Sequence, residues 1–298
     1  MQSEPYDMKH TIILLLSMVL CLSAVAGNIK KDSLAFADAD WQVTRLDDGA
    51  TAMSAQIHMF DSRQNISVLK YPSRKFRTRF VHSPGEMAGK TSSIAQREGA
   101  AMAVNGGYFD MKALVPCVYF RIGEETFSQT SPSETFRVNG VVGLKNRRGR
   151  KIMIASCSPD ENDAVTGKWH SAMASGPMLL DEGKILVPEY AEVDETGKGT
   201  DSFNDKRHPR SVIGHDGKGN VFLLVIDGRH AGKGDGTSIY ETALICRFLG
   251  MKDAINLDGG GSSALWHEDL GVLSHPSDNK AFDHEGERTI PNIIGVYR

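Results

Sequence analysis

The sequence predicts an α+β fold that is rich in strands, with a mixed but largely antiparallel sheet and a C-terminal βαβ unit carrying a glycine-rich motif. Many short apolar runs in the first two-thirds of the chain are separated by turn signals such as Asp47-Asp48-Gly49 and Asn139-Gly140. Such spacing is typical of strands joined by hairpins. A strand–helix–strand pattern follows between Val221 and Leu257, and the two strands of such a crossover are usually parallel.

The N-terminal residues 1–26 are predicted to be a signal peptide. Lys9 and His10 precede the apolar run Thr11–Ala26, which ends in Ala24-Val25-Ala26, the small-x-small pattern of a cleavage site. The run is shorter than the roughly 20 residues of a membrane span. We therefore expect an exported protein, periplasmic or secreted, that keeps no stable membrane span after cleavage near Ala26. Residues 27–298 are expected to form a single domain.

Charge and cysteine content narrow the possible partners. The formal net charge of −3 provides no electrostatic footprint for nucleic acid. Two basic clusters, Arg74–Arg79 and Lys145–Lys151, are interpreted as solvated strand edges and turns.

Cys117 and Cys157 are the one pair considered for a disulfide, which export would permit. No Cys-x-x-Cys or His-Glu-x-x-His spacing exists, so zinc has little support. We expect no cofactor, although the sequence leaves a divalent metal ion as an alternative. The sequence does not indicate an oligomeric state.

The central stretch begins with six consecutive apolar residues, Val221–Ile226. A run of this length that ends in Asp-Gly is typical of a strand buried on both faces. Ser238 stands three residues before Glu241, which is the spacing of a capping box at a helix start. A second short apolar run, Ala254–Leu257, follows the predicted helix and leads into the motif Asp258–Ser263.

Two carboxylates are expected at one edge of the sheet. Asp227 and Asp258 each follow a strand, and parallel strands place their carboxyl ends at the edge where α/β sheets bind ligands. Gly259–Gly261 would allow a ligand to approach the backbone and would offer N–H groups to an anion. Ser262 and Ser263 add hydroxyl groups. Each Asp-Gly has the alternative of being a simple turn, but a turn requires one glycine and not three.

The strand-like run Ala100–Val104 leads into Asn105-Gly106-Gly107-Tyr108-Phe109. This repeats the order of apolar strand, Asn or Asp, and glycine. Tyr108 is either an ordinary hydrophobic plug or a ring at the mouth of a sugar pocket, with Asn105 bonding a sugar hydroxyl.

A polar segment, Glu189–Lys206, is expected to be a long surface loop. It ends at Arg207-His208-Pro209-Arg210-Ser211, directly before another predicted strand. The arginines are either a charged strand edge or a phosphate-binding pair, because a guanidinium matches phosphate oxygens with two parallel hydrogen bonds.

Taken in order, these motifs resemble those of the phosphodiester glycosidase family. The resemblance covers the chain from Thr91 to its C-terminus. It rests on Asn105–Phe109, Ser175–Pro177, Arg210–Gly214, Asp227–Arg229, Asn256–Ser263, and Glu287-Arg288 with Pro291-Asn292. Ser211 stands where the family pattern has threonine, which keeps the hydroxyl.

The resemblance implies an exported hydrolase that cleaves the sugar C1–O bond of an N-acetylglucosamine-1-phosphodiester-like substrate, releasing free sugar and a phosphomonoester. A phosphate ester leaves with its charge and needs no proton, so a cation and backbone amides can replace the acid of an ordinary glycosidase. Arg210 is the expected clamp, with Arg207 or Arg229. Asp258 or Asp227 would be the base or nucleophile. The other expected substrate-binding residues are Asn105, Gly106, Tyr108, Ser211, Gly259, Gly260, Ser262 and Ser263.

Two other functions stay open at this stage. The first is a metal-dependent phosphodiesterase in which Asp227, Asp258 and either His208 or His230 bind a divalent ion and the P–O bond is cut. The second is a non-catalytic module that binds a sugar or a phosphoglycan with the same residues. Loss of activity on chelation would favour the first, and tight binding without turnover would favour the second.

Overall fold

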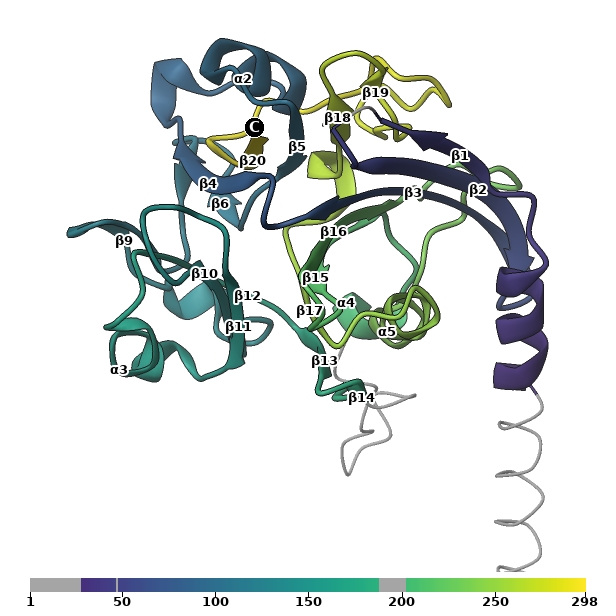
Figure 1. Ribbon diagram of the computed structural model, residues 1–298, viewed down its shortest axis with the longest axis horizontal. Coiled ribbons are helices and arrows are strands. Elements are labelled where there is room, and N and C mark those ends of the chain that lie inside the picture. Colours follow the sequence, from purple (N-terminus) through teal and green to yellow (C-terminus); the bar gives the residue numbers. More distant parts are fainter. Residues whose placement is uncertain (1–27, 47, 188–201) are drawn as a thin grey trace, which may run out of the picture.

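The computed structural model describes residues 28–46, 48–187 and 202–298, whose strands form three main sheets (Figure 1). The predicted signal peptide and residues 189–201 of the predicted loop lie outside the described residues. The largest sheet has eight strands, in the order β1 (Gln42–Arg45), β2 (Thr51–Met59), β3 (Ser62–Pro72), β16 (Asn220–Ile226), β15 (Arg210–His215), β17 (Asp253–Asn256), β13 (Met178–Asp181) and β14 (Lys184–Ile185).

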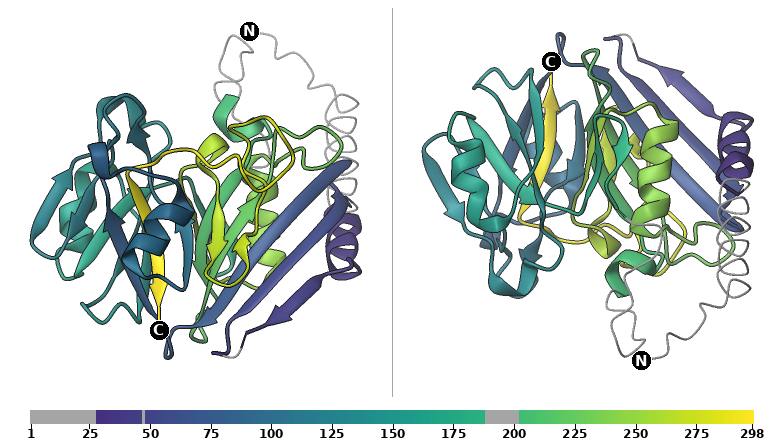
Figure 2. Two further views of the ribbon diagram at one scale, coloured as in Figure 1. Left: turned by 90° about the horizontal axis from the view of Figure 1, so that it is seen from above. Right: turned by 90° about the horizontal axis from the view of Figure 1, so that it is seen from below.

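Two five-stranded sheets complete the framework. One has the order β19 (Gly271–Val272), β18 (Leu265–His267), β5 (Met102–Asn105), β20 (Asn292–Tyr297) and β4 (Arg77–His82). The other has the order β11 (Ile152–Ser156), β10 (Gly140–Leu144), β12 (Ser171–Ser175), β8 (Phe120–Ile122) and β9 (Glu125–Ser128). In Figure 2 the teal strands of this last sheet lie at the opposite end of the molecule from the purple strands β1 and β2.

The remaining elements are short. A small ribbon pairs β6 (Phe109–Asp110) with β7 (Val115–Pro116). Residues 28–37 are helical. The other helices are α2 (Thr91–Glu98), α3 (Asn162–Thr166), α4 (Ser202–Asp205) and α5 (Ile239–Phe248), and the 3-10 turns are η1 (Gly85–Met87), η2 (Pro132–Glu134), η3 (Pro159–Glu161) and η4 (Gly260–Ser262). The predicted α+β, strand-rich and largely antiparallel architecture is confirmed.

Strand β16 is buried on both faces, as its unbroken apolar run predicts. Leu223 and Val225 face a core that also contains Val104 of β5 and Val142 of β10, so the three sheets share it. The alternate residues Phe222, Leu224 and Ile226 face a second core beneath α5 (Figure 1). Because successive side chains of a strand point to opposite faces of the sheet, this one strand contributes to both cores.

The C-terminal strand–helix–strand unit is present as β16, α5 and β17, but its two strands do not pair. Strand β15 lies between them and is antiparallel to both. All strand pairings in the described residues are in fact antiparallel, so the sheet gains no parallel pair from this unit. Strands β16 and β17 still run in the same direction, about 10 Å apart. Asp227 and Asp258 therefore follow strand ends at the same edge, one strand apart.

Of two turns predicted from local sequence, the structure contains one and lacks the other. Asp48-Gly49 does join β1 to β2. Asn139-Gly140 is not a hairpin turn, because Gly140 begins β10 and the Asn139 side chain accepts a hydrogen bond from the Met178 amide at 2.7 Å. Its partner lies far along the chain, which no local pattern shows.

Cys117 and Cys157 are both free thiols, so the considered disulfide is not formed in the structure. Burial raises the pKa of the Cys157 thiol to about 11. A thiol with such a pKa stays protonated and unreactive at neutral pH.

Within the described residues, no helix combines the length and the hydropathy that a membrane span would need.

The capping box of α5 supplies a stability prediction. The Ser238 hydroxyl accepts from the Glu241 amide at 3.1 Å, and the Glu241 carboxylate accepts from the Ser238 amide at 2.8 Å. We expect Ser238→Ala to lower the free energy of unfolding by about 1 kcal/mol in urea denaturation, because a helix end that packs on the core loses its cap. Ser158→Ala is the matched control, since Ser158 forms the same box on the exposed turn η3. An equal loss for both variants would contradict this account.

Candidate active site

A cleft of about 280 Å³ opens beyond the end of β17, where Asp258 follows the strand. Its lining is strongly basic: among the lining residues Asp258 is the one carboxylate, and it is accompanied by four arginines and a histidine. The lining residues are Tyr108, Phe109, Met111, Arg137, Phe203, His208, Arg210, Arg229, Asp258, Gly259, Gly260, Gly261 and Arg288. A concave site with this charge is suited to an anionic ligand.

Six of the residues expected from the sequence line this cleft, namely Tyr108, Arg210, Arg229, Asp258, Gly259 and Gly260. The others do not: Asn105, Gly106, Arg207, Ser211, Asp227, Ser262 and Ser263. The sequence reasoning missed Arg137 and Arg288. Arg288 belongs to the Glu287-Arg288 motif, which could have marked it as a site residue. Arg137 lies in no motif, and only the tertiary fold brings it to the cleft.

Asn105 positions Asp258 and leaves no polar atom for a sugar hydroxyl. Its side-chain amide donates to the Asp258 carbonyl at 2.6 Å. Its side-chain oxygen accepts from the Ser211 hydroxyl at 2.7 Å and from the Ala264 amide at 3.2 Å. The Asp258 amide donates to the Gly106 carbonyl at 3.1 Å. Asn105, Ser211 and Gly106 therefore form the buried support on which Asp258 stands.

Burial raises the pKa of the Asp258 carboxyl to about 6. The nearby Ser262 hydroxyl, Arg137 and Arg288 act in the opposite direction by favouring the charged form. Asp258 is partly exposed to the cleft, so it can reach a ligand there. A carboxyl with this pKa is mostly ionised at pH 7 and is more basic than an ordinary aspartate.

The hydroxyls of Ser262 and Ser263 lie behind the cleft surface. Both residues are 2% exposed, and neither hydroxyl has a partner with full hydrogen-bond geometry among the described residues. A side-chain interaction with Ser262 nevertheless favours the charged form of the Asp258 carboxyl.

Arg229 is the cleft arginine that is available to a ligand. It is exposed and forms no hydrogen bond or ion pair within the described residues. By contrast, Arg137 pairs with Glu134 and stacks on the Tyr108 ring at 3.8 Å. Arg288 pairs with Asp278 at 2.5 Å. These carboxylate partners hold the two guanidinium groups in place while they face the cleft.

The three consecutive glycines are explained by three different close approaches. A Cβ atom on Gly259 would lie 2.7 Å from the Pro209 carbonyl oxygen, and one on Gly260 would lie 2.8 Å from the Arg229 guanidinium. A Cβ atom on Gly261 would overlap the Arg288–Asp278 pair. The glycines thus admit arginines to the cleft. The Gly260 amide donates to the Pro209 carbonyl at 2.9 Å, so it is not free to hold an anion as the sequence suggested.

Arg210 builds the wall of the cleft. It is 1% exposed, and it donates to the backbone carbonyls of Thr237, Phe203 and Lys206 at 2.8–2.9 Å. Its guanidinium also lies 5.0 Å from the Phe203 ring centre. Arg207 is turned away from the cleft because it pairs with Glu241 at 2.6 Å.

Tyr108 lies beneath Arg137 and not at an open mouth. It is 1% exposed, and its hydroxyl donates to the Gly176 carbonyl at 2.7 Å. His208 is a lining residue whose pKa is lowered by burial and by the charges of Arg210 and Arg229. Its imidazole is therefore neutral at pH 7.

Asp227 belongs to a separate buried cluster. Its carboxylate accepts from the Asn65 side chain at 2.6 Å and from the His275 ring and amide at 2.8 and 2.9 Å. The structure does not bring it into the cleft with Asp258. In the part of the chain that the structure describes, His267, Glu268 and Asp269 are the group with metal-ligand spacing. The set Asp227, Asp258 and His208 or His230, required by the metal-dependent alternative, is not such a group.

Comparison with known sequences shows which family the chain resembles. A model of the phosphodiester glycosidase family matches residues 98–297. The N-acetylglucosamine-1-phosphodiester alpha-N-acetylglucosaminidases of Bos taurus and Homo sapiens are 29% and 28% identical to the chain over 222 residues, which is 70% of it. The matches cover 39% and 40% of those relatives, so the chain spans less than half the length of these two curated relatives.

Two solved structures share the fold. The catalytic domain of the zebrafish N-acetylglucosamine-1-phosphodiester alpha-N-acetylglucosaminidase, auto-inhibited by its pro-peptide, has a TM-score of 0.60 at 20% identity and covers 88% of this chain and 82% of that chain. A hypothetical protein from Synechocystis has a TM-score of 0.60 at 18% identity, with coverages of 87% and 64%. With the family model matching well over half of its residues, this chain belongs to the phosphodiester glycosidase family of hydrolases.

Proposed function

We propose that the chain is an exported glycosidase that hydrolyses the C1–O bond of a sugar-1-phosphodiester, with N-acetylglucosamine as the sugar. The family, and the activity for which the mammalian relatives are named, support this proposal. The observation that carries it is the pairing of one carboxyl of raised pKa with four arginines in a single cleft. The free sugar and a phosphomonoester are the products.

The charge of the leaving group explains why one carboxylate suffices. An ordinary glycosidase uses two carboxyl groups because the leaving alcohol must be protonated. A phosphomonoester leaves as an anion. When the C1–O bond breaks, its electron pair stays on a phosphate oxygen, which Arg229 and Arg288 stabilise with charge-assisted hydrogen bonds. Neutral His208 adds a polar group beside them.

Asp258 takes the role of nucleophile or base at the anomeric carbon. It either attacks C1 directly or removes a proton from the attacking water, and the ionised form is required in both cases. This role is supported by the fact that Asp258, Arg229 and Arg288 line the same cleft. Asp227 is given no part in this step, because its oxygens accept hydrogen bonds from Asn65 and His275 and it does not line the cleft.

The bond that is broken is the first test. In ¹⁸O-labelled water, α-N-acetylglucosamine-1-phospho-methyl ester should yield labelled free sugar and unlabelled methyl phosphate, as read by phosphorus NMR and mass spectrometry. Water adds to C1 in a glycosidase and to phosphorus in a phosphodiesterase. Label in methyl phosphate would replace this proposal with the phosphodiesterase. Tight binding of the ester without products would indicate a binding module.

Replacing Asp258 should lower activity and raise stability. Activity of the wild type should rise with pH through about 6, because only the ionised carboxyl reacts. Above that pH the folded protein holds an unfavourable buried charge, since the unfolded value is near 3.8. Asp258→Asn should therefore abolish turnover and increase the free energy of unfolding at pH 7 by about 1–2 kcal/mol, a figure reduced for partial exposure. The gain should shrink as the pH falls through about 6 and vanish well below 3.8, where the carboxyl is neutral in both the folded and the unfolded state.

Asp216→Asn is the matched control for this stability change. Hydrogen bonds from Asn220 and Lys218 lower the pKa of Asp216 against a burial effect that would raise it. The ionised form stabilises the fold above the unfolded pKa, so its loss should destabilise the protein at pH 7. Destabilisation by Asp258→Asn as well would overturn the assignment of a strained catalytic carboxyl.

Substitutions of Arg229 and Arg210 should have different effects, the first on catalysis and the second on stability. Arg229→Ala should lower kcat/KM by about 10²–10³ without loss of stability, because an exposed donor to the leaving phosphate is removed. Arg210→Ala should instead lower the free energy of unfolding by about 2–4 kcal/mol, because three buried hydrogen bonds are lost. Thermal unfolding and steady-state kinetics on both variants measure this. Native-like kinetics for Arg229→Ala would remove it from the clamp.

A further inference from the structure

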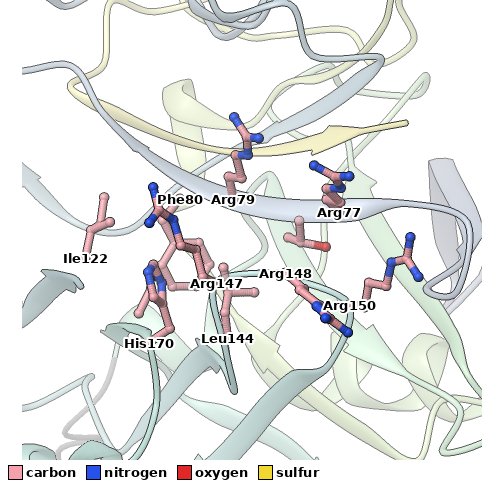
Figure 3. Close-up of a pocket in the computed structure, with 11 residues that line it drawn as sticks. Arg77, Arg79, Phe80, Ile122, Leu144, Arg147, Arg148, Arg150 and His170 are labelled. Atoms are coloured by element: carbon pink, nitrogen blue, oxygen red, sulfur yellow. The ribbon is translucent and has the colours of Figure 1, made fainter.

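A second basic groove, of about 760 Å³, lies outside the active-site cleft. Its charged lining comes from the two basic clusters that the sequence suggested were separate solvated edges. Arg77 and Arg79 extend from β4, and Arg147, Arg148 and Arg150 from the turn between β10 and β11, with His170 nearby (Figure 3). The fold thus joins two clusters that are about 70 residues apart in the sequence.

One backbone contact holds the two clusters together. The Thr78 amide donates to the Gly149 carbonyl at 2.8 Å. Arg77 and Arg79 flank Thr78, and Arg148 and Arg150 flank Gly149. Gly149 has a φ of +63°, and a Cβ atom there would overlap the Thr78 backbone. Glycine is therefore required for the turn to dock on β4 and to gather four arginines around a single contact.

In the part of the chain that the structure describes, no carboxylate pairs with these arginines. The groove lining contains no acidic residue, and none of its five arginines forms an ion pair within the described residues. The whole chain has more acidic than basic residues, 37 against 34, so the basic groove is a local concentration. Burial and the charge of Arg147 lower the pKa of His170, which fits a positive field. Like charges held together repel, and an anionic ligand would relieve that repulsion.

The groove and the cleft lie at opposite ends of the same strands. At one end of β20, the Asn292 carbonyl accepts from the Gly106 amide beside the Asp258 support. At the other end, Tyr297 pairs with Arg77 of the groove. Asn292 and Tyr297 are five residue steps apart along the strand, or about 17 Å. The two sites share no lining residue.

We propose that this groove binds further phosphates of a long, phosphodiester-linked glycan while one sugar occupies the cleft. The proposal rests on the proposed function, because it assumes a substrate of this class. Arginine is suited to phosphate through its two parallel donors. Single-stranded nucleic acid would call for exposed aromatic rings on which bases stack. The one aromatic ring in the lining other than His170 is Phe80, which is buried.

The test measures binding of a fluorescein-labelled oligomer of N-acetylglucosamine joined through phosphodiesters. Fluorescence anisotropy is read in an Asp258→Asn background of the full chain, so that the probe is not consumed. Substitution of Arg147, Arg148 and Arg150 by alanine should weaken binding by about 10-fold or more at low salt, and should reduce the slope of log affinity against log salt by about 2. In the wild-type background the same triple variant should raise KM for the oligomer and leave kcat/KM for the methyl phosphodiester unchanged.

The matched control replaces Lys30, Lys184 and Arg247 with alanine, which removes three exposed cations far from the groove residues in the sequence. It should leave oligomer binding unchanged, and both triple variants should unfold at the wild-type temperature. Wild-type oligomer affinity in the folded groove variant would overturn the proposal. Equally tight, groove-dependent binding of a single-stranded DNA of matched charge would overturn the ligand class. Groove-dependent oligomer binding by a wild type that hydrolyses neither substrate would support the groove and refute the proposed glycosidase.

Discussion

The buried side chain of Asn105 is the interaction on which the cleft depends. It joins the ends of β5 and β15 to the segment between β17 and β18, through Asp258, Ser211 and Ala264. A buried amide that lost these partners would be left unsatisfied at a substantial cost. The three segments are consequently held in one arrangement, and the backbone of Asp258 is oriented before any ligand arrives. Preorganisation of this kind is what an active site requires of its support.

In the cleft, burial and neighbouring charges have opposite effects on the pKa of Asp258. Burial pushes the Asp258 carboxyl toward its neutral form, while Arg137 and Arg288 favour the anion, and the result is a pKa of about 6. Glu134 and Asp278 hold these two arginines, whereas Arg229 has no carboxylate partner among the described residues. The cleft therefore combines fixed cations with one available cation. In the proposed function, such a combination would stabilise an anion that develops at the leaving oxygen.

Much of the local structure was predictable because it depends on neighbours in the sequence. The apolar run of β16 and the capping box at Ser238 specify a buried strand and a helix start through contacts within a few residues. The pairing of β15 between β16 and β17 was missed because strand order depends on contacts between distant segments. The same cause explains Asn139, whose side chain binds the Met178 amide instead of forming a turn.

The strand-rich fold class, the family motifs and the position of Asp258 directly before three glycines could all be read from the amino-acid sequence. The tertiary structure alone decided which polar residues share a cleft. It placed Asn105 and Ser211 behind Asp258, brought in Arg137, and left Asp227 with His275. It also turned two distant basic clusters into one groove through the contact of Thr78 with Gly149. The physical reason is that a motif specifies residue types and local backbone shape, whereas hydrogen bonds and burial between distant segments decide where each side chain points.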